Sequence, residues 1–450
     1  MILPMGKPSL KQVLGVPDGI AILIGITIGA GIYSTPQIIA RHMVSFNAII
    51  ALWLLVGFFV FISGLVYAEL GTRMPNTGGE YVYYTRCFGP WVGFMFGWAQ
   101  MFIIRTSAAA ALALIIVDYA GYFIPLKGFV RIATALAVIF LFGLVNYIGI
   151  QRASIFQKIS TVLKVAGLLS IAVIGFIFSG GHENLLSTRA ALQDTLGPVG
   201  GLAAVLMLIV FSHTGWERIG YVAGEMKNPR RVIPLSLTIG IGTVVLLYAL
   251  TNMTYHRILG IDGMRASTIV ASDVLTLLIG PIGAAYIAIL VIISSAGSIN
   301  GTMMTATRAY YAMAKDGLFF KWLDHVHTEF HTPSRAIVAH CVWAGVILLI
   351  RGSFQSIASG MAFAILIFYG LAVVALFKMR RDKIGETDIF KVPLYPFLPL
   401  LLLILIVCLI VFRAVFEWRN SLTDMAFIAT GIPFAFYWCR KRLETPSTRC

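Results

Sequence analysis

The residues most suggestive of binding chemistry lie where small or polar residues interrupt two apolar runs. The first run is IAILIGITIGAGIYSTP, with glycines at positions 25, 29 and 31, and the second is VLMLIVFSHTGWERIGYVAGE, interrupted at residues 212–215. A glycine in a helix interior costs roughly 1 kcal/mol relative to alanine, and backbone inside a bilayer leaves the helix only where it lines a cavity. The two interruptions therefore predict two broken helices with a binding site between them. The alternative is that these glycines only let helices pack closely.

Ionisable residues inside apolar runs must be paired or functional. Arg105, Lys164, Glu217 and Arg218 lie inside such runs, and a Lys or Arg at the centre of a spanning helix costs about 2.5–3.5 kcal/mol on insertion scales. We interpret Arg105, Glu217 and Arg218 as members of structural ion pairs. One interpretation of Lys164 is that its ammonium extends to the membrane interface. His213 either senses protons or donates a hydrogen bond to a side chain, and we favour the hydrogen bond.

The sequence lacks the patterns of several other functional classes. It has no HExxH, GxSxG or paired-carboxylate arrangement that would indicate an enzyme. Its five Cys show neither a CxxC pair nor metal-ligand spacing, so we expect no metal and no cofactor. The formal charge of +15 does not indicate nucleic-acid binding, because Lys and Arg lie in short loops and not on one polar face. A channel would need repeated rings of carbonyls or charges.

Composition indicates that membrane-spanning helices position these residues. Hydrophobic residues make up 59% of the chain and charged residues 12%, with a mean hydropathy of +0.88, whereas soluble domains are about 25% charged. Apolar runs lie around residues 17–40, 46–70, 90–120, 130–150, 156–179, 198–224, 232–255, 281–310, 335–351, 356–378, 394–414 and 420–439. Since a spanning helix needs about 20 apolar residues, we expect an all-α integral membrane protein of about 12 transmembrane helices in a single domain, 1–450.

The runs fall into two groups of five and a final pair. Five precede the polar stretch GGHENLLSTRAALQDT, and the interrupted runs open the two groups of five. Interrupted helices at matching positions are typical of inverted repeats in transporters. We therefore expect a first repeat over 17–179, a second over 198–378, and helices 11 and 12 within 394–439. Lys and Arg concentrate in alternate loops, which predicts that both termini face the cytoplasm.

Four longer segments carry a resemblance to a known superfamily. They are IGAGIYSTP, YAELGTRMPNTGGEYVYYTRCFGPWVGFMFGW, FSHTGWERIGYVAGEMKNPRRVIP and SSAGSINGTMMTATRAYYAMAKDGLFFKWLDHVHTEFHTPSRAI, in this order over the first ten runs. They resemble the amino acid–polyamine–organocation superfamily, and within it the L-amino-acid transporter light chains and their bacterial relatives. The resemblance implies a multi-pass transporter of the plasma membrane, in bacteria the inner membrane, with an amino acid as substrate and no enzymatic activity.

The resemblance also implies which groups hold an amino acid. Amides at residues 29–31 would receive the carboxylate, as anions bind at helix N-termini. Carbonyls at residues 27 and 28 and in the second interruption would receive the ammonium. Ala30 stands where the family usually has Ser, which leaves carboxylate binding mostly to the backbone, and Phe211 matches an aromatic that closes over substrate. The expected substrate-binding residues are Thr27, Ile28, Gly29, Ala30, Gly31, Phe211, Ser212, His213 and Thr214.

Coupling or gating is expected from Lys164, Phe211 and Glu217. The resemblance places Lys164 where sodium-coupled cousins of the fold bind their ion, so its ammonium would brace freed carbonyls of the first helix. The expected function is sodium-independent exchange of neutral L-amino acids by alternating access. The alternatives are proton-coupled uptake and a polyamine or cationic amino acid permease, for which Glu217 would be the acidic partner. The stretch GYFIPLKGFVRI lacks the Cys that ties human light chains to a glycoprotein, so we expect no disulfide-linked heavy chain.

Overall fold

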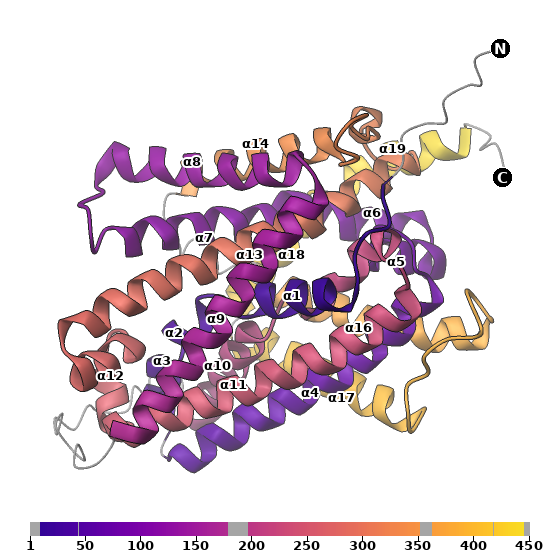
Figure 1. Cartoon of the computed structure of the whole chain (residues 1–450). Coiled ribbons are helices and arrows are strands. Elements are labelled where there is room, and N and C mark those ends of the chain that lie inside the picture. The colour runs from indigo at the N-terminus through magenta and orange to yellow at the C-terminus, as the bar shows by residue number, and fades with distance from the viewer. Residues whose placement is uncertain (1–9, 44, 179–196, 352–361, 417, 445–450) are drawn as a thin grey trace.

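The computed structural model describes residues 10–43, 45–178, 197–351, 362–416 and 418–444. Every regular element in these ranges is a helix (Figure 1). This all-α architecture agrees with the prediction from the apolar runs. Its physical basis is that a bilayer core offers no hydrogen-bond partners, so a spanning segment must satisfy its backbone groups internally.

The helices of the described ranges occur in the following order along the chain. The first part of the chain contains α1 (Val16–Thr27), α2 (Gly31–Ser34), α3 (Pro36–His42), α4 (Phe46–Arg73), α5 (Glu80–Phe88), α6 (Pro90–Ala99), the π-helical turn η1 (Gln100–Ile104), α7 (Arg105–Ala120), α8 (Gly128–Tyr147) and α9 (Ile150–Phe178). The second part contains α10 (Gly197–Ser212), the 3₁₀ segment η2 (Trp216–Glu225), α11 (Pro229–Ala266), α12 (Val270–Ile279), α13 (Pro281–Lys315), the 3₁₀ turn η3 (Lys321–Leu323), α14 (Ser334–Arg351), α16 (Ala362–Arg381), α17 (Phe397–Phe416), α18 (Trp418–Ala429) and α19 (Ile432–Glu444).

Eight helical stretches of the described chain are long and apolar enough to cross a bilayer. Each overlaps a run predicted from the sequence. They are Val16–Ser34, Phe46–Arg73, Pro90–Ala120, Gly128–Tyr147, Ile150–Ile177, Pro229–Ala266, Pro281–Lys315 and Phe397–Phe416, and Val270–Ile279 and Ser334–Ile350 are shorter apolar helices. These spans are those of an integral membrane protein.

One predicted run differs in detail from the structure, and another is only partly described. The run 420–439 is not continuous, because α18 ends at Ala429 and α19 begins at Ile432. The reason is local: Gly431 and Pro433 flank the start of α19, and a proline has no backbone N–H to continue a helix. The start of the run 356–378 lies outside the described residues, and α16 forms the rest.

The first broken helix passes through the middle of the helical assembly. α1 contacts α9, α11 and α13, and Figure 1 shows it between these longer helices. Ile22 and Leu23 of α1 are fully buried. Because protein surrounds α1, backbone groups that leave its helical pattern can find partners on neighbouring helices.

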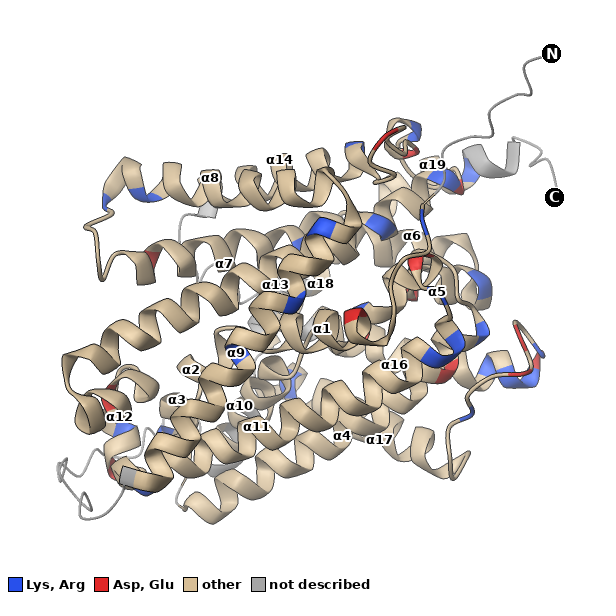
Figure 2. Cartoon of the chain, in the orientation of Figure 1, with Lys and Arg blue, Asp and Glu red and all other residues tan. Residues whose placement is uncertain are grey.

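Charged residues mark the ends of the helices. In Figure 2, Lys and Arg gather around α5, α19 and the segment that follows α16, whereas the middle of the assembly carries few. This distribution agrees with helices that run through an apolar layer and end in polar surroundings.

Candidate functional site

The first helix breaks at residues 28–30. α1 ends at Thr27, Ile28 is extended with ψ 90°, and α2 starts again at Gly31. At the break the amide of Gly29 donates to the carbonyl of Thr27 at 2.9 Å. Gly31 opens a new helix, so its N–H has no partner within that helix. The break therefore presents donors on one side and freed carbonyls on the other.

Lys164 of α9 occupies the freed carbonyls of this break. Its Nζ donates to the carbonyls of Gly25 at 2.7 Å, Ile28 at 2.8 Å and Ser294 at 2.9 Å. These bonds use all three N–H groups of an ammonium. The Lys164 side chain is fully buried, and it joins α1, α9 and α13 at one point.

The sixth predicted run breaks between α10 and η2. Gly215 has φ 122°, a conformation that favours glycine. A Cβ on Gly215 would lie 2.8 Å from Cγ2 of Ile26 and 3.1 Å from the amide nitrogen of Thr27, so glycine is also required by the close approach of the two breaks. The hydroxyl of Tyr248 lies 3.1 Å from the carbonyl of Thr27 and 3.0 Å from that of Ser212, and it bridges them.

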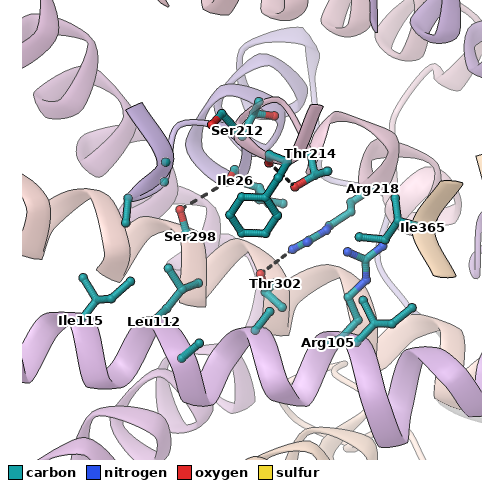
Figure 3. Close-up of a pocket in the computed structure, with 18 of the residues that line it drawn as sticks. Ile26, Arg105, Leu112, Ile115, Ser212, Thr214, Arg218, Ser298, Thr302 and Ile365 are labelled. Carbon is teal, nitrogen blue, oxygen red and sulfur yellow. Dashed lines mark hydrogen bonds between the residues drawn. The ribbon is translucent and has the colours of Figure 1, made fainter. Parts of the chain in front are cut away.

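One cavity lies between the two breaks, with a volume of about 100 Å³. Figure 3 shows residues of the breaks on one side and residues of α7 and α13 on the other. Seven of the residues expected from the sequence line it: Thr27, Gly29, Ala30, Gly31, Phe211, Ser212 and Thr214. Residues of both broken helices thus line one space that could hold a small ligand.

The other expected residues lie behind this cavity. Ile28 is fully buried, and its carbonyl is taken by Lys164 and by the hydroxyl of Ser294 at 2.9 Å. His213 is buried with its ring near Trp53 and Tyr248, at centroid distances of 5.5 and 5.0 Å. Its Nδ1 lies 2.9 Å from the carbonyl of Ile209. His213 therefore contacts α4 and α11, away from the cavity lining.

Glu217 forms hydrogen bonds that connect the second break with neighbouring helices. Its carboxylate accepts the amide of Gly215 at 2.8 Å, a guanidinium nitrogen of Arg105 at 3.1 Å and the hydroxyl of Tyr369 at 3.0 Å. Glu217 therefore forms an ion pair with Arg105, which agrees with the interpretation of both residues as members of structural ion pairs. This ion pair connects η2 with α7, and the hydrogen bond from Tyr369 to Glu217 connects η2 with α16.

Polar residues on the far wall of the cavity were not predicted as site residues from the sequence. Ser298 and Thr302 of α13 line it, as do Arg105 and Arg218. Ser298 and Thr302 are four residues apart in SSAGSINGT, which places them on one helix face. This spacing of four residues was the feature of the sequence that could have indicated a polar helix face at the site. Within the described residues, no group of three His, Cys, Asp or Glu side chains could hold a metal ion.

Comparison with known proteins identifies the family. Residues 14–435 match the amino acid permease family. The serine/threonine exchanger SteT of Bacillus subtilis (strain 168) is 30% identical over 87% of this chain and 89% of its own length. The b(0,+)-type amino acid transporter 1 of Mus musculus is 27% identical over 98% of this chain and 92% of its own length. The cystine/glutamate transporter of Pongo abelii is 29% identical, with 86% and 78% covered.

These matches extend over nearly the whole helical assembly, including both breaks and the cavity between them. The family and these relatives are transporters and not enzymes. The chain accordingly belongs to the amino acid permease family, within the amino acid–polyamine–organocation superfamily.

Proposed function

We propose that this permease is a sodium-independent exchanger of neutral L-amino acids that works by alternating access in the plasma membrane. The observation that carries the proposal is a cavity lined by residues of both broken helices. A ligand there meets N–H groups at the start of α2 and carbonyl groups at the end of α10. Such a pair of helix ends is complementary to a zwitterion.

The ammonium of the substrate is assigned to carbonyls near the end of α10. The carbonyl of Phe211 accepts the hydroxyl of Thr214 at 2.8 Å, and that of Ser212 accepts Tyr248. The carbonyl of Phe211 also accepts the amide of Thr214 at 3.1 Å, whereas that of Ser212 has a second lone pair and can accept a further hydrogen bond. We assign the carboxylate to the break at residues 29–31, where Gly29 already donates its amide to Thr27 and the amides of Ala30 and Gly31 are left as donors. We assign Phe211 to closure over the bound substrate.

Sodium independence follows from the position of Lys164. A fixed ammonium already holds the carbonyls of Gly25 and Ile28, which leaves no need for a sodium ion at that place. Exchange is favoured over proton coupling because the Bacillus subtilis relative is named an exchanger and because His213 faces away from the cavity.

The proposed membrane topology has two inverted repeats, 17–179 and 198–378, followed by two further helices, with both termini in the cytoplasm. The two breaks support the repeats, because each opens one group of five apolar runs. The gathering of basic residues around α5, α19 and the segment after α16 supports a cytoplasmic location for that end (Figure 2). We also propose that the transporter works without a disulfide-linked heavy chain, and that its membrane is a bacterial inner membrane.

Competition against labelled L-alanine in proteoliposomes tests the substrate assignment. Alanine methyl ester and propionate each lack one charged group, and each unmade contact leaves buried polar backbone unpaired, at a cost of about 1–3 kcal/mol. We expect each analogue to compete roughly five-fold to more than a hundred-fold more weakly than L-alanine. Strong inhibition by putrescine, with none by alanine or leucine, would indicate a polyamine permease instead.

A further inference from the structure

Two arginines enter the cavity on the wall opposite the first break. Figure 3 shows the guanidinium of Arg105, on α7, and that of Arg218, on η2, at the cavity. Thr302 of α13 forms a hydrogen bond with Arg218 there. The π-helical turn η1 ends immediately before Arg105, and such turns shift the side chains that follow them relative to a regular helix. Both arginines are more than nine-tenths buried, at 2% and 7% exposure.

The described protein groups leave part of both guanidiniums without hydrogen-bond acceptors. Arg105 donates from Nη2 to Glu217, but its Nε and Nη1 are buried with no acceptor. Arg218 donates from Nη1 to the hydroxyl of Thr302, and its Nε has no hydrogen-bond acceptor. The nearest carboxylate oxygen, Oε1 of Glu217, lies 3.5 Å from that Nε. Buried donors of this kind are rare, because each costs free energy when it is left unpaired.

The nearby carboxylates do not accept from these unpaired nitrogens. Glu217 already accepts from Gly215, Arg105 and Tyr369. Glu80 of α5 instead accepts the hydroxyls of Tyr67 at 2.6 Å, Tyr84 at 3.2 Å and Tyr221 at 2.7 Å. Burial raises the pKa of Glu80, which favours its uncharged form. Among the described ion pairs, Arg105 and Arg218 share one carboxylate, that of Glu217, so their two positive charges face one negative charge.

A carboxylate on the substrate side chain would supply both the missing hydrogen-bond acceptors and a second negative charge beside the two arginines. Its two oxygens accept several N–H bonds in the planar geometry of guanidinium groups, and its charge balances the wall. A neutral side chain leaves the donors unpaired. We propose that Arg105 and Arg218 form a second anion subsite that binds the side-chain carboxylate of acidic L-amino acids, so that these are transported in addition to neutral ones. The inference rests on the proposed amino acid exchange and names a further substrate class for the same cavity.

The test compares acids with their amides of equal size. In proteoliposomes that exchange L-alanine, inhibition constants are measured for L-glutamate against L-glutamine and for L-aspartate against L-asparagine. We expect the wild-type protein to bind the acid more tightly than the amide by about ten-fold or more, the scale of a charge-assisted hydrogen bond. In Arg218→Gln this acid-to-amide ratio falls towards one, and Arg218→Lys restores part of it.

A matched control removes one positive charge elsewhere. Arg381, exposed and paired with Asp382, lies outside the cavity, so Arg381→Gln keeps the wild-type ratio. Alanine exchange without any preference for acids in the wild type would overturn the subsite and leave the proposed exchange intact. A preference that survives in Arg218→Gln would also overturn it. If no amino acid is exchanged at all, the proposed function fails, and the subsite fails with it.

Discussion

Lys164 is the residue on which the transport mechanism depends most directly. Its ammonium takes the place of the hydrogen-bond donors that a continuous helix would supply to Gly25 and Ile28, and it ties them to Ser294 of α13. It does not line the cavity, so its proposed role is to link helices as they move and not to contact the substrate.

Replacing Lys164 with alanine should therefore slow transport more than it weakens binding. The change leaves buried carbonyls without their donor, which costs on the order of 1–3 kcal/mol per group and disturbs the link between α1 and α13. We expect the exchange rate to fall about ten-fold or more while affinity for L-alanine changes less. Exchange kinetics and ligand-induced thermal stabilisation of the purified protein measure the two effects. Unchanged transport would remove Lys164 from the mechanism.

Single residues could be predicted from the sequence where their chemistry is unusual for a membrane span. Lys164, Arg105 and Glu217 stand out because charge is costly there. The direction of a side chain is harder to predict: His213 lies in the second break yet faces α4 and α11, and Arg218 enters the cavity. A break has no regular periodicity, so the sequence does not indicate which of its side chains face the ligand.

The two broken helices form the site because their breaks touch each other. A Cβ on Gly31 would lie 3.2 Å from Cα of Ser212, whereas a Cβ on Gly29 would meet only Oγ of Ser298, at 3.7 Å. The two glycines therefore serve different purposes. Gly31 permits the close approach of the helices, as the packing alternative anticipated, and Gly29 keeps space open beside the cavity.

Valine at these two positions should separate binding from folding. Gly29→Val places methyl groups where the carboxylate is assigned, so we expect affinity for L-alanine to fall about ten-fold or more with little change in the melting temperature. Gly31→Val forces apart packed backbone, so we expect it to lower the melting temperature as well. Thermal unfolding and binding are measured on the same monodisperse preparations. Wild-type affinity in Gly29→Val would exclude the amides of residues 29–31 as the carboxylate site.

Helices as elements were more predictable than their irregular turns. Long apolar runs identify spans because about 20 residues are needed to cross the bilayer, and the glycine and polar interruptions indicated both breaks. The π-helical turn η1 was not predicted, because QMFII is an ordinary apolar segment. The 3₁₀ geometry of η2 was also missed. Both depend on packing against other helices, and both set the position of an arginine.

At the scale of the whole molecule, the proposed exchanger has a cavity between two broken helices and a buried ammonium, that of Lys164, at the first break. Composition was enough to predict an all-α membrane protein, whereas the cytoplasmic side inferred from the charge distribution stays a prediction. Composition and charge distribution were not enough to define the side chains that the transporter accepts, because the far wall of the cavity comes from α7, α13 and α16, which are distant from the breaks in sequence.

Counterflow in proteoliposomes tests the central claim most directly. Vesicles that contain the purified protein are loaded with unlabelled L-alanine, and uptake of labelled L-alanine is followed with choline in place of sodium on both sides. We predict a transient accumulation that depends on the internal amino acid and does not change when sodium is restored. Uptake that requires sodium, or that is equal in loaded and empty vesicles, would contradict sodium-independent exchange.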